Sequence, residues 1–407
     1  MKRTVLFCAT LWVICFAAPA FAENKAMPQF AIPTAKSNGM GGSHVAYTDN
    51  VFALLVNPAA IMRVEQRSFF ALSPTLLNPQ TTFGLIGPFQ DAAGGDMSTL
   101  GDEADILSKQ KGKIPLGFDL REFPLSFAWV ADGFGFGLWD RIFVNPNIIG
   151  THVDLNVYAD VILPVGFAFR ILDTEAHDVD VGVTAKPFVR VIGREKVDIL
   201  ELMDNDDILD TIAVPVIAGA GVNLGLLYRW DIGLRAGVTF DDIFTRGVVV
   251  STITGEDDET YYVPFTINAG LAYDFKIGRF WKTAPGFLAN MGFTLAFDWR
   301  DIVNAFQQDD YQKRNTLLDM GAGFQVSLYD MFMLRIGMNE MLPSFGFGFD
   351  LGPLEIDLAY YGKELGLEPG LLSTAAVDVT IALRPGAKKR NWPWTRRSLV
   401  GLFTGSH

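Results

Sequence analysis

The feature that most constrains this chain is a recurring alternation of apolar side chains with small or charged ones. In His177–Val183 three valines alternate with two aspartates and a glycine, and the same rhythm returns in Leu354–Tyr360 and Val377–Leu383. Successive side chains of a β-strand point to opposite faces, so each segment has one apolar face and one small or charged face. Segments of about ten residues can cross a bilayer as tilted strands.

Hydrophobicity elsewhere in the chain also has to be explained by strands. Apolar residues make up 49% of the sequence, yet beyond the N-terminus no run of about 18 apolar residues suggests a membrane helix. A soluble β-sandwich would also alternate, but strand length and aromatic content favour lipid outside and a polar lumen. We therefore expect an all-β fold, a transmembrane antiparallel β-barrel of about 14 strands over residues 68–384, with about 12 to 16 strands compatible.

The N-terminus has the pattern of a secretory signal peptide. Lys2 and Arg3 precede the apolar run Val5–Ala18, and Ala20–Ala22 supplies small residues for cleavage. We expect removal of residues 1–22, with cleavage near Ala22, and delivery to a bacterial outer membrane. The formal net charge of −13 then becomes −15 because both cations leave, and nucleic acid is not an expected partner.

Nothing in the sequence indicates enzymatic chemistry, a cofactor or a metal. Both cysteines, Cys8 and Cys15, lie in the signal segment, so no disulfide or thiolate site is expected in the mature chain. The bulky Ile14 before Cys15 argues against a lipoprotein anchor. No G-x-S-x-G elbow is present, although a Ser-His-Asp triad is a spatial arrangement that sequence alone does not reveal.

Phenylalanine and glycine alternate in two segments, Gly133–Trp139 and Phe345–Phe349. One face of each segment carries large rings and the other is nearly bare. The rings suit a lipid-facing surface, while the glycines would either let a plug approach the wall or relieve strand curvature. The polar faces of the strands predict a set of lumen charges, which are Asp178, Asp180, Arg235, Arg335, Glu355, Asp357 and Asp378.

The connections between predicted strands differ in length. Tight turns are expected at Asp132–Gly133, Arg229–Asp231, Tyr329–Asp330 and Gly352–Pro353, and longer ones at Gln90–Lys113, Gly193–Asp210, Gly255–Glu259 and Asp301–Asn315. Asp301–Arg314 has helical spacing and predicts a short helix. The acidic runs Asp204–Asp207 and Glu256–Glu259 could hold Ca²⁺, but they lack the EF-hand spacing, and solvated loops are the favoured interpretation.

The segment before the barrel, residues 23–67, is glycine-rich and not strand-like, so we do not expect it to form part of a regular wall. Pro58 fixes its own φ and donates no backbone hydrogen bond. Asn57 would then cap a rigid turn or helix start.

This segment also carries a family resemblance. The pattern G-x-G-G-x-x-x-A-x-x-D over Gly39–Asp49, followed by Asn57–Ala59, resembles the N-terminal region of the FadL-like long-chain fatty-acid transporters of outer membranes and their PorV-like relatives. The pair Leu318–Phe324 and Met333–Gly337 resembles a strand pair of that superfamily, and Phe345–Tyr361 resembles its penultimate hairpin. Two departures are Gly323-Phe324, where an acidic-aromatic pair is common, and the chain beyond Leu383.

The resemblance implies a 14-stranded barrel plugged by an internal hatch over residues 23–67, with uptake of long-chain fatty acids or other hydrophobic small molecules as its function. The candidate ligand-path residues of this hatch are Gly39, Gly41, Gly42, Phe52, Leu54, Leu55, Asn57, Pro58 and Ala59. Such uptake predicts a continuous apolar pocket that reaches the hatch near Phe52, Leu54 and Leu55. The alternative is a structural or secretion-associated barrel whose lumen is filled and which recruits other proteins.

The last segment, residues 385–407, is basic and contains Trp392 and Trp394. It could lie on an anionic membrane surface or dock a periplasmic protein. The other expected partners are outer-membrane lipid, the outer-membrane assembly machinery and the hydrophobic ligand itself.

Overall fold

The computed structural model describes residues 25–30, 34–64, 68–81, 113–115, 117–122, 126–149, 152–198, 214–252, 260–307 and 313–385. The expected signal peptide, both acidic runs and the tail after Pro385 lie outside these residues. No helix in the described ranges is long and apolar enough to span a membrane.

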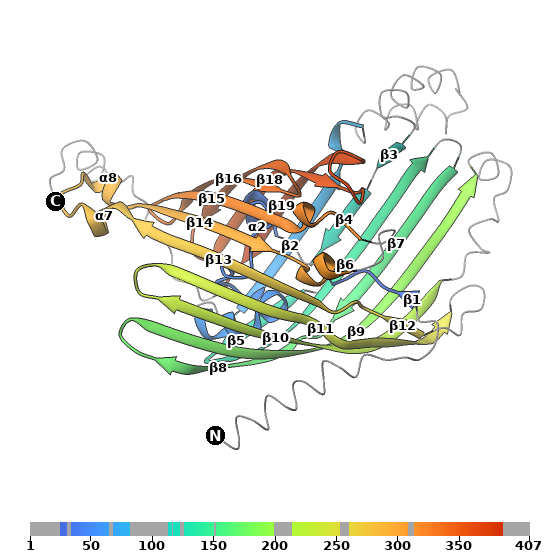
Figure 1. Cartoon of the computed structure of the whole chain (residues 1–407), viewed down its shortest axis with the longest axis horizontal. Helices are drawn as coiled ribbons and strands as arrows, with labels where there is room; N and C mark the ends of the chain where they lie inside the picture. Colours follow the sequence, from blue (N-terminus) through green and yellow to red (C-terminus); the bar gives the residue numbers. More distant parts are fainter. Residues whose placement is uncertain are drawn as a thin grey trace.

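The wall is one closed antiparallel β-barrel of 14 strands (Figure 1). Each wall strand pairs with the strands before and after it in the chain, and β19 (Ser373–Leu383) pairs with β2 (Ser68–Leu77) to close the barrel. Closure gives the backbone groups at the free edges of the first and last wall strands a partner, which a lipid environment would require. The predicted fold class and strand number are confirmed.

Three positions in the wall are each built from consecutive shorter strands. The position between β2 and β6 (Phe134–Ile149) holds β3 (Lys113–Pro115), β4 (Gly117–Arg121) and β5 (Phe127–Ala131). The position between β6 and β9 (His177–Asp198) holds β7 (His152–Ile162) and β8 (Val165–Asp173). The position after β11 (Leu234–Thr252) holds β12 (Thr260–Tyr262) and β13 (Thr266–Lys276). The remaining wall strands are β10 (Pro215–Trp230), β11 (Leu234–Thr252), β14 (Met291–Trp299), β15 (Met320–Leu328), β16 (Phe332–Asn339), β17 (Leu342–Asp350) and β18 (Leu354–Glu364).

The two ends of the barrel differ, and we name them by their connections. The short-turn end carries the turns at residues 132–133, 174–176, 231–233, 329–331 and 351–353, together with α7 (Ile277–Phe280) and α8 (Gly286–Ala289). The long-loop end carries η4 (Ile302–Phe306) and η5 (Thr316–Asp319). Of the predicted helix Asp301–Arg314, the structure describes one 3₁₀ turn, which Asp301 caps by accepting from the Asn304 amide.

One predicted connection is wrong at its start. Gly193–Asp198 belongs to β9, where it continues the ladder with β7 as far as the pair His152↔Asp198. The side chains of Arg194, Glu195 and Lys196 are exposed to solvent. This part of β9 therefore lacks the alternation of apolar and polar residues that identified the other strands.

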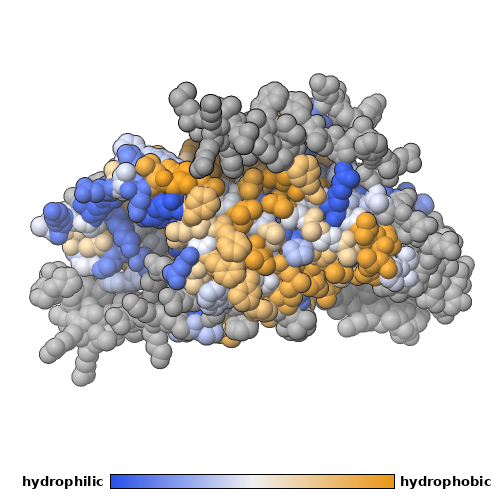
Figure 2. All heavy atoms as spheres, turned by 90° about the horizontal axis from the view of Figure 1, so that it is seen from below, coloured by the Kyte–Doolittle hydropathy of each residue, from blue (hydrophilic) through white to orange (hydrophobic). Residues whose placement is uncertain are grey.

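The exposed apolar side chains of the wall face outward, whereas its glycines and buried charges face inward. Phe345 and Phe347 of β17 are 52% and 40% exposed, whereas Gly346 and Gly348, which alternate with them, face side chains and backbone inside the barrel. Figure 2 shows apolar side chains gathered into a broad area on one outer face. The rings therefore form part of the outer surface, as their alternation with glycine predicts.

Inside the barrel lies the hatch, which contains α2 (Ala35–Gly39), α3 (Ala53–Val56) and η1 (Pro58–Arg63). In Figure 1 these elements are blue and are enclosed by the strands. The α2 helix contacts β17 and β18, and η1 contacts β8, β9 and β10. The hatch thus spans the lumen and packs against opposite parts of the wall.

Candidate functional site

The hatch is organised around Asn57, which is fully buried at 0% exposure. Its Oδ1 accepts a hydrogen bond from the Ala59 amide at 3.1 Å, with Pro58 in the first turn of η1. Its Nδ2 donates to the Val45 carbonyl at 2.9 Å. Asn57 therefore caps η1 and also ties it to the glycine-rich half of the hatch.

Glycines of the wall let the hatch backbone approach closely. A Cβ at Gly182 would collide with the Pro58 carbonyl, and a Cβ at Gly225 would collide with Oδ1 of Asn57. The same holds opposite the first half of the hatch, where Gly321 faces Gly41 and Gly323 faces Met40. A plug that rests against the wall, rather than strand curvature alone, explains these glycines.

Within the hatch, Gly41 and Gly42 have φ of +68° and +79°. Both values lie in the left-handed region that residues with a Cβ rarely adopt. The predicted glycine pattern therefore has a backbone reason at these two positions. Gly39 instead needs space, because its missing Cβ would lie 2.9 Å from the Cα of Gly346 in β17.

Polar side chains of the wall hold the hatch in place. Asp298 of β14 accepts hydrogen bonds from the amides of His44 and Val45, at 2.5 and 2.8 Å. On the other side of the lumen, Asn38 donates to Asp378 of β19 at 2.7 Å. The carboxylates of the wall thus satisfy buried donors of a segment that has little regular structure of its own.

The predicted lumen charges all face the interior, and they are paired. The short ion pairs are Arg335–Asp357 at 2.5 Å, Arg384–Glu355 at 2.9 Å, Arg121–Asp378 at 2.8 Å, Arg235–Asp274 at 2.5 Å, Arg63–Asp180 at 2.6 Å, Arg170–Asp180 at 2.8 Å and Arg229–Asp178 at 2.7 Å. Pairing and hydrogen bonding are the usual conditions under which charges are tolerated inside a protein.

Several of these partners were missed from the sequence. Arg384 continues the inward register of β19, in phase with Asp378 and Ala382, and Arg121 has the inward phase of Asp119 in β4. Alternation could therefore have identified both arginines. Arg63 gave no such signal, because it lies in the hatch, outside any strand. Its ion pair with Asp180 of β9 depends on the tertiary fold.

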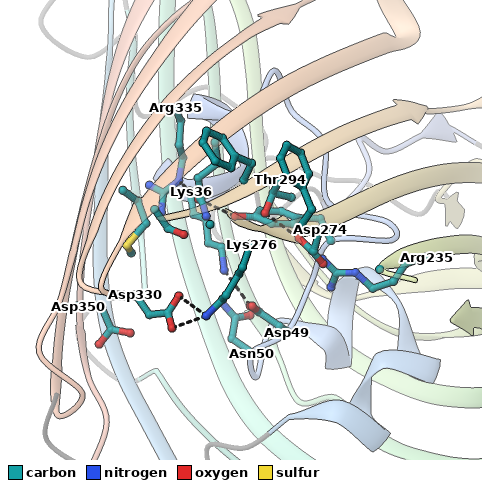
Figure 3. Close-up of a pocket in the computed structure, with 18 of the residues that line it drawn as sticks. Lys36, Asp49, Asn50, Arg235, Asp274, Lys276, Thr294, Asp330, Arg335 and Asp350 are labelled. Atoms are coloured by element: carbon teal, nitrogen blue, oxygen red, sulfur yellow. Dashed lines mark hydrogen bonds and ion pairs between the residues drawn. The ribbon is translucent and has the colours of Figure 1, made fainter. Parts of the chain in front are cut away.

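A polar cavity of about 1110 Å³ lies between the hatch and the short-turn end. Figure 3 shows Lys36 and Asp49 of the hatch beside Lys276 and Asp330 of the wall. Lys36 and Asp49 are 2.8 Å apart, as are Lys276 and Asp330. Charges of both signs therefore line this cavity, which suits water and polar solutes rather than the storage of an apolar ligand. We call it the vestibule.

The expected apolar path takes a different form. Phe52, Leu54 and Leu55 are buried against the wall and do not line the vestibule. They belong to a packed set of inward-facing apolar residues that we call the inner apolar cluster. Its members include Met27, Phe52, Leu54, Leu55, Trp139, Tyr158, Ile162, Phe188, Ile192, Ile217, Tyr261 and Val263. The cluster joins the hatch to the long-loop half of the lumen, where Phe52 and Trp139 have ring centroids 6.3 Å apart.

Comparison with known proteins gave matches among solved structures only. No protein-family model matches the chain, and no curated protein matches it. The chain is similar to the CymD monoaromatic hydrocarbon channel, with 12% identity, 88% of this chain and 98% of that chain covered, and a TM-score of 0.48. The P. putida toluene transporter TodX is 12% identical, with 91% of this chain and 99% of that chain covered and a TM-score of 0.45. A Pseudomonas aeruginosa FadL homologue is 8% identical, with 89% of this chain and 100% of that chain covered and a TM-score of 0.44.

Proposed function

We propose that this protein is a bacterial outer-membrane barrel that takes up apolar small molecules, long-chain fatty acids among them, past the hatch in its lumen. The outward apolar surface and the inward ion pairs have the polarity expected of a barrel with lipid outside. Closed strand pairing and the short turns at one end also fit this location.

The inner apolar cluster is the observation that carries the proposal. A channel for polar solutes would have a water-filled polar lumen, but in the long-loop half rings and branched side chains pack together down to Phe52 and Leu54. The buried charges among them are paired, as Arg190 is with Asp160. The hatch contributes Phe52 and Leu54 to this cluster and contacts opposite parts of the wall, so we expect it to block free diffusion. An apolar molecule would find a matching surface above the hatch and would leave through the wall or through the wet vestibule.

A structural or secretion-associated barrel is the second candidate. It is favoured by the α7–α8 segment at the short-turn end, where Trp281 is 51% exposed and lies close in sequence to Lys276, Arg279 and Lys282. Such a basic aromatic surface suits docking of another protein. In this case the lumen would stay filled and no solute would pass.

Uptake measurements distinguish the two functions. Cells that lack this protein would be compared with cells that express the parent chain, and initial uptake of radiolabelled oleate and ethylbenzene would be measured, with arabinose as the polar control. We expect the parent to raise uptake of at least one apolar solute and not of arabinose. No increase for either apolar solute, with a correctly folded barrel in the outer membrane, would contradict the proposal and favour the structural role.

A matched hatch variant links uptake to the lumen. Asn57→Ala with Pro58→Ala removes the cap of η1 and its fixed φ, while the wall strands are unchanged. We expect this variant to alter uptake of the apolar solute and to admit arabinose, because the hatch no longer seals the barrel. Unchanged rates for all three solutes would place the transport path outside the hatch.

A further inference from the structure

The segment that contains α7 and α8 differs in charge from the short turns at the same end of the barrel. Four of the five short turns contain a carboxylate, and these are Asp132, Glu175, Asp231 and Asp330. None of the five contains lysine or arginine. Residues 276–290 contain no carboxylate and three cations, which are Lys276, Arg279 and Lys282. Among these connections, positive charge is found on one only.

Two of the three cations fasten this segment to neighbouring turns. Nζ of Lys276 lies 2.8 Å from a carboxylate oxygen of Asp330, in the turn between β15 and β16. Nη1 of Arg279 donates to the Asp231 carbonyl at 2.9 Å, in the turn between β10 and β11. In the order of the wall, these two turns flank β13 and β14 on opposite sides. The base of the segment is therefore held from both sides.

Beyond these contacts, the tip of the segment presents Trp281 and Lys282. Trp281 is 51% exposed, and its indole N–H donates to the nearby Thr283 hydroxyl at 2.9 Å. Lys282 is exposed and makes no hydrogen bond or ion pair with a described residue. In Figure 1 the segment is orange and lies beyond the left ends of β13 and β14. An aromatic ring and a free ammonium thus remain for an outside partner.

A row of aromatic rings on the outer wall lies directly next to this segment. Tyr273 of β13 and Phe324 of β15 are both register partners of Leu295, which is 49% exposed on the outer face. Phe275 and Phe293 continue the row, with centroid distances of 5.7, 4.9 and 5.9 Å from Tyr273 through to Phe324. Outer-membrane barrels carry aromatic girdles at both membrane interfaces. The row therefore places the interface at the last residues of β13.

The length of α7 keeps the tip close to this interface. Phe275 lies two residues before α7, and four residues of helix rise about 6 Å. The headgroup layer adds roughly 5–8 Å on each side of the hydrocarbon core. Trp281 and Lys282 would therefore lie at the level of the headgroups, where an amphipathic ring and a long cationic side chain are both favourable.

We infer that the tip of this segment is an anchor that binds an anionic phospholipid of the leaflet at the short-turn end. The Trp281 ring packs among the upper parts of the acyl chains, and the Lys282 ammonium binds the phosphate. A zwitterionic headgroup would bring its own cation beside those of the segment, whereas a headgroup with net negative charge, such as that of phosphatidylglycerol, would not. The inference goes beyond the proposed function, because a transporter and a structural barrel can both use such an anchor.

Quenching of tryptophan fluorescence by brominated lipid tests the anchor. The purified full-length protein is placed in nanodiscs of phosphatidylcholine. A rising fraction of that lipid is replaced by phosphatidylglycerol or phosphatidylcholine that is brominated on the upper part of the acyl chain. Because the chain has 8 tryptophans, the signal of Trp281 is taken as the difference between the parent and Trp281→Phe.

Three further variants isolate the charge at the tip. Lys282→Gln removes it, and Lys282→Arg retains it. The matched control is Lys196→Gln, which changes an exposed lysine at the far end of β9. The signal of Trp281 in each variant is obtained in the same way, by difference from the same variant with Trp281→Phe.

We expect brominated phosphatidylglycerol to quench Trp281 at a lower fraction than brominated phosphatidylcholine does. Lys282→Gln should raise the required fraction of phosphatidylglycerol by roughly fivefold, the effect of one lysine near an anionic surface. Lys282→Arg and Lys196→Gln should leave this fraction unchanged. High salt should weaken the preference of the parent.

Equal quenching by the two lipids, or a preference that Lys282→Gln does not reduce, would overturn the inference. A Trp281 signal that neither lipid quenches would also overturn it, because the ring would then lie in water, where a protein partner could bind it. Uptake of apolar solutes by cells is a separate measurement. Its failure would contradict the proposed function and leave the lipid anchor as it stands.

Discussion

Oδ1 of Asn57 in the hatch lies only 2.2 Å from the position that a Cβ on Gly225 of β10 would take. The two residues are 168 positions apart in the chain, and their contact fixes how deeply η1 sits against the wall. The same oxygen caps η1 through the Ala59 amide. A side chain at position 225 would therefore displace the cap and the helix together.

Gly225→Val is expected to loosen the hatch. Overpacking of a tight contact costs about 1–3 kcal/mol, and here the hatch can yield more readily than a closed barrel. We expect several-fold higher ion conductance of the protein in planar bilayers. The control is Gly193→Val in β9, where a Cβ has only an ordinary contact of 3.7 Å with Val157. Equal conductance of the two variants would show that the hatch does not depend on this contact.

The cap itself can be separated from the link to Val45. Asn57→Asp keeps an oxygen that accepts from Ala59 but cannot donate to the Val45 carbonyl, whereas Asn57→Ala loses both bonds. We expect Asn57→Ala to lower the free energy of hatch opening by about 1–3 kcal/mol, measured by amide hydrogen exchange within residues 34–64. In Asn57→Asp, the amides near Val45 should exchange faster than in the parent protein, whereas the amides of η1 should stay as protected as in the parent. Identical exchange in both variants would contradict this division of roles.

The lumen ion pairs stabilise the barrel only as pairs. Arg335 and Asp357 are buried and 2.5 Å apart. Removing one partner leaves an uncompensated charge, which costs about 3–5 kcal/mol, whereas replacing both with apolar residues of similar volume is often neutral. We expect Arg335→Met to lower the urea unfolding midpoint strongly, and Arg335→Met with Asp357→Leu to restore much of it. A double variant no more stable than the single one would show that hydrogen bonds to neighbours such as Gln325 dominate.

The sequence predicts the wall well because each strand carries its own signal. Alternation identifies β18 and β19 to within a few residues, and the Phe-Gly runs identify the outward faces of β6 and β17. The prediction failed at Gly193–Asp198, because that part of β9 has exposed side chains. A strand in such a place needs no apolar face, so its sequence does not alternate. Strand pairing also explains why Ser68 and Leu383 bound the barrel, since they lie on the two strands that close it.

The interior was predictable only in part. The glycines of Gly39–Gly42 and the Asn57-Pro58 pair report local backbone requirements, so sequence indicated a hatch with a capped turn. The partners of buried charges are spatial, and nothing near Arg63 in the sequence indicates Asp180. The segment Lys25–Phe30 is too short to show periodicity, and the place of its strand β1 (Lys25–Ala26) beside β12 depends wholly on the fold.

The contact between Lys36 and Asp49 makes the hatch sensitive to acid. Enclosure in the barrel acts to raise the pKa of Asp49, but the Lys36 ammonium at 2.8 Å outweighs it and holds this pKa below its ordinary value of 3.8. A carboxylate with a depressed pKa stabilises the fold above its unfolded pKa, and this contribution is lost as the pH falls through the folded value. We therefore expect hydrogen exchange of the hatch near Asn50 to quicken below about pH 4 relative to the wall strands. Asp49→Asn should exchange faster at neutral pH and lose this acid dependence. Because the Asp49 side chain is half-exposed to the vestibule, the effect should also weaken in high salt. An acid response that persists unchanged in Asp49→Asn would assign it to another carboxylate of the lumen.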